Sequence, residues 1–278
     1  MMTSTISTSH TFISADGSTM AYQTVGQGPA VIVVPGALST AETYAAFATA
    51  LGQHFTVHTL ERRGRGLSAP QGQDYSLAKE REDLLALQRI TGATLLVGHS
   101  YGGLICLESA RNQPVFTRVA VYEPGVSIDG SINMSWLDAY GRYLARGKEL
   151  DAFVTFVLGT GPDRFRNMPH WYMRLLMPLF LNPQERKERF PLLAESLREH
   201  QEVARYDNSY KNYGEISAEV LLMTGGATGS RWVEIQPDIL TRIIPHFQSH
   251  RFAKFDHFGI DKKAPQVVAE VVHHFFQE

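Results

Sequence analysis

One short segment constrains the fold of this chain more than any other: the pentapeptide Gly98-His99-Ser100-Tyr101-Gly102. It follows an apolar run, residues 93–97, that predicts a buried strand, and it precedes a helical pattern at residues 104–112. A serine on so sharp a strand-to-helix turn adopts strained backbone angles, and small residues on either side let the neighbouring segments approach. We therefore expect the Ser100 hydroxyl to project above a sheet, beside free N–H groups at a helix N-terminus that suit a negatively charged oxygen.

Strand and helix patterns alternate along the chain before and after this turn. Asp16-Gly17 is a turn signal between two strand patterns, which predicts an antiparallel hairpin. Ser39 and Glu42 have the spacing of a capping box, and Ser76 is the expected cap of a second helix. The expected strands are residues 11–14, 20–24, 30–34, 55–60, 93–97, 115–122, 220–224 and 251–255. This alternation predicts an α/β fold with a mainly parallel, eight-stranded sheet and helices on both faces.

The alternation is interrupted for about ninety residues in the middle of the chain. A chain of 278 residues with 44% hydrophobic content can form one large core that carries an insertion. The interrupting segment is rich in aromatic residues and methionine at helical spacing. We predict a core of residues 1–125 and 216–278 and a helical cap of residues 126–215.

A cap over the serine would enclose an apolar cavity, because small-molecule pockets favour such interfaces. The residues expected to bind substrate there are Leu38, Trp136, Trp171, Tyr172 and Phe258.

Charge and cysteine content restrict the partners of this chain. The formal net charge of −2 provides no field that attracts nucleic acid or an anionic membrane. Cys106 is the only cysteine, so no internal disulfide can form, and its apolar neighbours predict burial. No signal peptide pattern and no apolar stretch of roughly 18 residues is present, which favours a cytoplasmic protein. We expect a small-molecule substrate, with no nucleic acid or membrane partner, and a homodimer is left open.

The basic residues of one Gly-rich loop are expected to form structural ion pairs: Arg62, Arg63 and Arg65.

A histidine near the C-terminus is the candidate general base. His257 lies in the short segment Asp256-His257-Phe258-Gly259, between the last expected strand and the last expected helix. Ligands bind at the carboxyl ends of the strands in open α/β sheets, which is the edge where Ser100 also lies. A serine hydroxyl becomes a good nucleophile only when a base within hydrogen-bond reach removes its proton. The alternative is that His257 merely caps the final helix.

These features together resemble the α/β-hydrolase superfamily over nearly the whole chain. The stretches Glu-Arg-Arg-Gly-Arg-Gly-Leu-Ser at residues 61–68 and Val-Tyr-Glu-Pro at residues 121–124 are similar to its capped, single-domain bacterial members. The resemblance implies a nucleophile elbow at Ser100. It also implies an oxyanion hole from the backbone N–H groups of Tyr101 and Ala37. In this chain a proline replaces the histidine that usually stands two residues before the second donor.

The acid that would orient the histidine departs from the usual pattern of the superfamily. Most members have an aspartate after the strand that corresponds to residues 220–224, but residues 225–230 contain no carboxylate here. Glu123 is our candidate, because certain haloalkane dehalogenases and the zearalenone lactonases place the acid at this point. Gly226-Ala227-Thr228 is also similar to the zearalenone lactonases. The alternative is that Glu123 only ends its strand, which leaves Asp256 and Asp261 as the nearest carboxylates.

The candidate residues predict a cofactor-independent serine hydrolase that cleaves a carboxylic ester or lactone with an apolar body. Ser100 would attack, His257 would transfer the proton and Glu123 would orient His257. A serine at the elbow argues against the dehalogenases and epoxide hydrolases, which need an aspartate there. No metal-ligand spacing, phosphate-binding loop or dinucleotide fingerprint is present, so we expect neither metal nor cofactor. Cleavage of a carbon–carbon bond in a diketone, thioester hydrolysis and a receptor-like ligand-binding role stay open.

Overall fold

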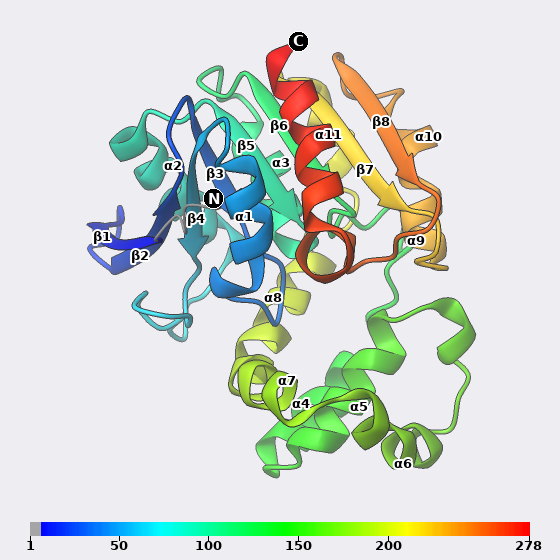
Figure 1. The fold of residues 1–278 in the computed structure, drawn as a ribbon. Coiled ribbons are helices and arrows are strands. Elements are labelled where there is room, and N and C mark those ends of the chain that lie inside the picture. The colour runs from blue at the N-terminus through cyan, green and yellow to red at the C-terminus, as the bar shows by residue number, and fades with distance from the viewer. Residues whose placement is uncertain (1–6) are drawn as a thin grey trace, which may run out of the picture.

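A computed structural model describes residues 7–278, which form an eight-stranded sheet with helices on both faces (Figure 1). The strands are β1 (Thr8–Ile13), β2 (Thr19–Val25), β3 (Ala30–Val34), β4 (Thr56–Glu61), β5 (Leu95–His99), β6 (Arg118–Tyr122), β7 (Glu219–Gly225) and β8 (Phe247–Phe252). Their order across the sheet is β1-β2-β4-β3-β5-β6-β7-β8. β2 pairs in antiparallel fashion with β1 and β4, and the other neighbouring pairs are parallel. The predicted mainly parallel, eight-stranded sheet is thereby confirmed.

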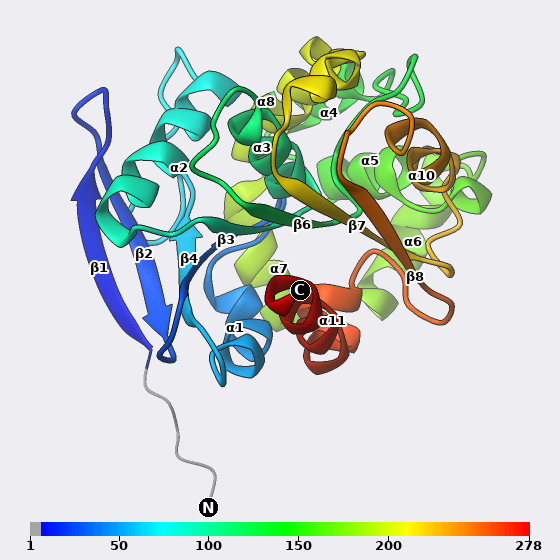
Figure 2. The same cartoon turned by 90° about the horizontal axis from the view of Figure 1, so that it is seen from above.

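Two helical layers cover this sheet (Figure 2). One face carries α1 (Ala45–Leu51) and α11 (Pro265–Gln277), and the other carries α2 (Leu77–Thr91) and α3 (Tyr101–Ala110). Two further short helices, α9 (Arg231–Glu234) and α10 (Gln236–Leu240), connect β7 to β8. None of the helices between residues 7 and 278 combines the length and the apolar character that a bilayer crossing requires.

The central strands are buried on both faces, as their continuous apolar runs predict. In β3, Val31 and Val33 pack in the cluster formed with α1 and α11. Ile32 and Val34 pack in the cluster formed with α2 and α3. Successive side chains of a strand point to opposite faces, so an uninterrupted apolar strand requires two cores.

Local sequence signals account for several element boundaries. The side chain of Ser76 accepts a hydrogen bond from the Lys79 N–H at the start of α2. Gly92 ends the same helix with φ +66°, and Gly17 turns the N-terminal hairpin with φ +81°. Both positions have a left-handed backbone conformation that glycine adopts without strain.

The predicted capping box at Ser39 and Glu42 is wrong. The Ser39 hydroxyl donates instead to the backbone carbonyl of Ala37, and only a single 3-10 turn, Glu42–Tyr44, precedes α1. The N-cap of that turn is Ala41, whose backbone is helical and which makes no side-chain cap. Ser39 therefore lies too far ahead of the first turn to cap it.

The chain between β6 and β7 is helical, as the sequence predicts. It contains α4 (Leu137–Ala145), α5 (Glu149–Thr160), α6 (His170–Phe180), α7 (Pro183–Arg189) and α8 (Leu193–Arg205). In Figure 1, α4 to α7 stand apart below the sheet, and they have an apolar cluster of their own. The end of this segment packs beside the sheet through Val203, Tyr210 and Tyr213. The division into a core and a cap of residues 126–215 stays a prediction, and these contacts join its last part to the core.

Candidate active site

Ser100 occupies the sharp turn between β5 and α3. Its backbone has φ +53° and ψ −121°, a conformation that is costly for any residue other than glycine. The neighbouring chains approach closely: a Cβ atom at Gly102 would lie 2.1 Å from the carbonyl oxygen of Val34. A Cβ at Gly98 would lie 2.6 Å from the carbonyl oxygen of Gly102. The small residues of the pentapeptide are therefore required by packing, and they allow the turn that places Ser100 in the wall of a cavity.

His257 and Glu123 are brought together at the same edge of the sheet. His257 Nδ1 lies 2.7 Å from Glu123 Oε2, and the glutamate side chain is fully buried. The other carboxylate oxygen, Oε1, accepts hydrogen bonds from the Gly225 N–H (2.8 Å) and from the Thr228 hydroxyl. With both oxygens occupied, Glu123 holds the proton on Nδ1 and leaves Nε2 of His257 as the basic nitrogen.

The protonation of His257 is set mainly by burial and by Glu123. Burial lowers the pKa of His257, but the hydrogen bond and the charge of Glu123 outweigh it, and the pKa lies above its ordinary value of 6.5. Asp261 and Asp256 add smaller contributions in the same direction. Within the described part of the chain, Asp256 forms its ion pair with Lys263, not with the His257 ring. The structure thus brings Glu123 to His257 and leaves the two aspartates outside the hydrogen-bonded pair.

Two backbone N–H groups are available beside Ser100. Ala37 and Tyr101 both line the cavity that contains the serine. Neither N–H donates to a backbone carbonyl of residues 7–278. Free N–H donors next to a nucleophile are the groups that stabilise an oxyanion in acyl transfer.

A buried tyrosine–histidine pair connects the loop after β3 to the His257 loop. The Gly36 N–H donates to Tyr44 Oη (3.0 Å), which lies 2.5 Å from His99 Nδ1. His99 Nε2 lies 2.9 Å from the backbone carbonyl oxygen of His257. A carbonyl can only accept, so Nε2 carries the proton and Nδ1 accepts from the tyrosine hydroxyl. Burial lowers the pKa of His99 well below its ordinary range, which keeps this neutral tautomer in place.

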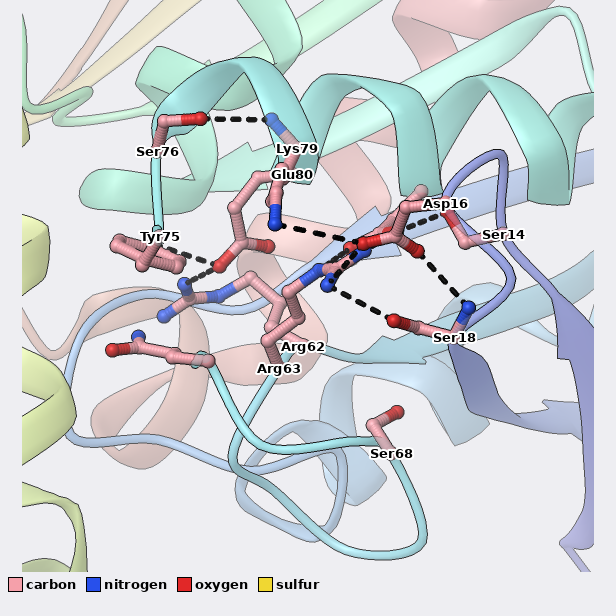
Figure 3. Close-up of polar contacts among 12 residues, drawn as sticks. Ser14, Asp16, Ser18, Arg62, Arg63, Ser68, Tyr75, Ser76, Lys79 and Glu80 are labelled. Carbon is pink, nitrogen blue, oxygen red and sulfur yellow. Dashed lines mark hydrogen bonds and ion pairs between the residues drawn. The ribbon is translucent and has the colours of Figure 1, made fainter. Parts of the chain in front are cut away.

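Arg62 also anchors the loop that follows β3. Its Nε and Nη2 donate to the backbone carbonyls of Pro35 and Gly36, each at 2.8 Å. Its Nη1 lies 3.0 Å from carboxylate oxygens of both Glu80 and Glu199 (Figure 3 shows the Glu80 side). Glu199 belongs to α8, so this buried cluster also ties the helical segment to the sheet.

The other two arginines of the basic run are paired as well. Arg63 contacts Asp83 and, as Figure 3 shows, Asp16, whereas Arg65 contacts Glu199. The prediction that this run forms structural ion pairs is confirmed.

A cavity of about 730 Å³ is lined by Ser100, by His257 and by side chains of the helical segment. Its lining next to the serine includes His99, Tyr101 and His257. Much of the remaining lining consists of apolar side chains of the helical segment, among them Phe153, Phe156, Met173, Met177 and Phe180. Ser100, His257 and the two free N–H groups thus line one largely apolar cavity.

The expected substrate-binding residues fall into two groups. Leu38 and Phe258 line the cavity. Trp136, Trp171 and Tyr172 are not among the lining residues, which corrects the sequence-based expectation. Trp136 is buried within the helical segment, and Trp171 and Tyr172 are 69% and 40% exposed on the outer face of α6.

The reason for this correction is helical geometry. An amphipathic pattern predicts that α6 has two faces, but not which face meets the cavity. The face that carries Met173 and Met177 is the one that lines it.

Sequence reasoning missed three residues that the structure places around the candidate site. Tyr44 bridges Gly36 and His99, and Trp232 of α9 lies edge-on to the His257 ring at 6.0 Å between centroids. His200 of α8 lines the cavity. No local pattern marks any of them, because each acts through contacts with residues distant in sequence. In the described residues, no group of three His, Cys, Asp or Glu side chains is arranged to hold a metal ion.

Comparison with solved structures agrees with this architecture. An alpha/beta hydrolase from Sphaerobacter thermophilus DSM 20745 superposes with a TM-score of 0.80 at 28% identity, over 96% of this chain and 100% of that one. The enol-lactonase from Burkholderia xenovorans LB400 has a TM-score of 0.72 at 18% identity, over 97% and 100% of the two chains. At that identity the second similarity concerns the fold alone.

Sequence comparison gives a partial match to a protein of known activity and a nearly complete match to a family. The N-formylmaleamate deformylase of Pseudomonas putida is 34% identical over 123 residues, which cover 42% of this chain and 46% of that protein. The matched region thus spans less than half the length of this curated relative. Residues 31–278 match the family described as "Alpha/beta hydrolase family". The chain therefore belongs to the alpha/beta hydrolase family.

Proposed function

We propose that this hydrolase cleaves a carboxylic ester or lactone with an apolar body through a triad of Ser100, His257 and Glu123. The observation that carries the proposal is the 2.7 Å contact between His257 Nδ1 and Glu123 Oε2, at the sheet edge that also carries the elbow serine. A receptor-like role with a broken triad is disfavoured, because a carboxylate does reach the histidine.

The reaction would proceed by acyl transfer. Ser100 Oγ attacks the carbonyl carbon while His257 Nε2 takes its proton, and the carbonyl electron pair moves onto oxygen. The N–H groups of Ala37 and Tyr101 hold this oxyanion, and losing one such donor typically costs about 10²–10³ in turnover. Collapse expels the alcohol, which receives the proton from His257. Water activated by His257 then attacks the acyl enzyme and releases the acid.

The cavity supports a substrate with a sizeable apolar part. Its volume of about 730 Å³ lies within the range of pockets that enclose small organic ligands. Phenylalanine and methionine side chains of α5 and α6 form much of the wall opposite the serine. A lactone is included because Glu123 and residues 226–228 are similar to the zearalenone lactonases, and here Thr228 donates to Glu123.

A second candidate is hydrolysis of an N-formyl amide. The partial match at 34% identity to the deformylase of Pseudomonas putida supports this second candidate. The same triad would serve, with the amide R-CO-NH₂ in place of the alcohol as the leaving group and formate as the acid released.

The test is turnover of purified protein on p-nitrophenyl esters of increasing chain length, several aromatic lactones and one N-formyl amide. Ser100→Ala is measured in parallel. We expect ester or lactone hydrolysis whose kcat falls by about 10⁴-fold or more in Ser100→Ala, since nucleophile removal abolishes covalent catalysis. Absence of Ser100-dependent turnover in folded protein would overturn the proposal, and turnover of the amide alone would replace it with the second candidate.

A further inference from the structure

His200 lies in the wall of the active-site cavity and takes no part in the triad. It belongs to α8, within the helical segment, and faces the same cavity as Ser100. Its ring is held edge-on by two aromatic side chains, Trp136 at 5.2 Å and Phe156 at 5.3 Å between centroids. The imidazole is therefore fixed in position before any substrate binds.

Hydrogen bonding defines the tautomer of this ring. His200 Nδ1 lies 2.8 Å from the backbone carbonyl oxygen of Ser196, one helical turn earlier. A carbonyl only accepts, so Nδ1 carries the proton and donates it. Nε2 is then a bare acceptor, and no hydrogen bond from residues 7–278 reaches it.

The ring is neutral in the physiological pH range. Burial lowers the pKa of His200, and this exceeds the opposing contributions of the Ser196 bond and the Glu199 charge. A neutral acceptor repels a carboxylate or a carbonyl oxygen and attracts an O–H or N–H group.

We infer that His200 Nε2 is a specificity site that binds a hydroxyl group on the apolar body of the substrate. The inference rests on the proposed hydrolysis at Ser100 and adds the class of substrate: a hydroxylated ester or lactone. The scissile carbonyl would lie at the serine while the hydroxyl reaches His200 in the cavity wall. The apolar side chains around the cavity would bind the carbon skeleton between these two points.

The test compares kcat/KM for pairs of p-nitrophenyl acyl esters that differ only in a terminal hydroxyl, over a series of chain lengths. At the length that reaches His200 we expect a preference of about 10-fold or more for the hydroxylated member. His200→Phe should bring this ratio close to one. His200→Gln, whose Oε1 can accept at a similar position, should keep part of it.

A matched control is His170→Phe. His170 is another half-buried histidine of the helical segment, bonded to the carbonyl of Asp151, and it is not part of the cavity lining. Its replacement should leave the preference unchanged. Preference for a hydroxylated member that persists in His200→Phe would overturn the inference. Equal rates for both members at every chain length, or a preference for a matching ester with a terminal carboxylate, would also overturn it.

A binding measurement separates this inference from the proposed function. Calorimetry with Ser100→Ala follows the binding of a hydroxylated aromatic lactone and of its deoxy analogue without turnover. Tighter binding of the hydroxylated lactone that disappears in Ser100→Ala/His200→Phe supports the site even if no ester is hydrolysed. Equal binding of the two lactones contradicts it even if the triad is active.

Discussion

The two sides of the cavity differ in how their side chains are held. The floor, at the carboxyl ends of β3, β5 and β6 and in the loop after β8, is a network of hydrogen-bonded polar groups. Glu123, His99 and Arg62 each contact two or more partners there. The roof, formed by residues of the helical segment, is mainly phenylalanine and methionine packed in an apolar cluster.

This difference predicts that the floor controls the chemistry and that the roof controls the choice of substrate. Hydrogen bonds are directional, so the floor defines the positions of the His257 ring and of the free N–H groups. Apolar packing is non-directional and tolerates swaps of similar volume, so the roof sets the size of the chamber. The four predictions below test whether the two sides are as distinct as their bonding indicates.

The largest expected effect is on the floor, at Glu123, the carboxylate that contacts His257. Glu123→Gln keeps the size of the side chain but removes the charge that stabilises the imidazolium, so we expect kcat to fall by about 10⁴-fold with little change in Tm. The control is Asp261→Asn, the same change at another buried carboxylate that lines the cavity. Steady-state kinetics measures kcat for both variants. Equal losses of kcat would contradict the proposal that Glu123 is the acid that orients His257.

The buried ion-pair cluster that connects the roof to the floor should control stability. In this cluster Glu199 of α8 contacts both Arg62 and Arg65. Glu199→Gln leaves Arg65 buried without its only carboxylate partner among the described residues and weakens the cluster around Arg62. Removal of one partner from a buried pair costs about 3–5 kcal/mol in the free energy of unfolding. Urea denaturation measures this loss, and the exposed Glu188→Gln on α7 should change it by less than about 0.5 kcal/mol. Similar small changes in the free energy of unfolding of both variants would show that this ion-pair cluster does not stabilise the fold.

Two buried tyrosines allow a direct comparison of floor and roof. Tyr44→Phe removes the hydroxyl between Gly36 and His99, and Tyr140→Phe removes a roof hydroxyl that donates to the Leu193 carbonyl. Each should lower the free energy of unfolding by about 1 kcal/mol. Only Tyr44→Phe should also lower kcat, by about 10-fold, because the loop that presents the Ala37 N–H loses an anchor. An equal loss of kcat in Tyr140→Phe would remove the distinction between the two sides.

The smallest effect is a shift in pH dependence. His257 must be neutral to accept the serine proton, and its pKa is raised, so kcat/KM should fall as the pH drops below that raised pKa. Glu123→Gln removes the main contribution that raises the pKa, and this acidic limb should move to lower pH. NMR titration of the His257 imidazole gives the same comparison without turnover. A pKa that stays unchanged in Glu123→Gln would show that the glutamate does not set the protonation of the histidine.

Much of the floor could be predicted because its signals are local. The glycines around Ser100 are required by a strained turn, and the apolar run of β5 marks the strand that leads into it. Parallel strands carry their loops to one edge, so Ser100, Glu123 and His257 were expected to lie near one another. The structure places the last two in contact across 134 residues of sequence.

The roof could not be predicted in the same way. Its aromatic pattern predicted helices, yet Trp171 and Tyr172 face outward while Met173 and Met177 face the cavity. The capping box at Ser39 failed for a related reason, since a sequence spacing does not show where the first helical turn begins.

The sequence by itself determined the sheet, the elbow turn and the family, because periodicity, glycine positions and strand order depend on short-range sterics and on chain connectivity. Only the tertiary structure decided which side chains support them. The Tyr44–His99 pair, the Arg62–Glu199 contact and the acceptor at His200 each join residues whose neighbours in sequence give no sign of the partner. Such contacts depend on how helices and loops pack against the sheet, and that packing is a property of the whole core.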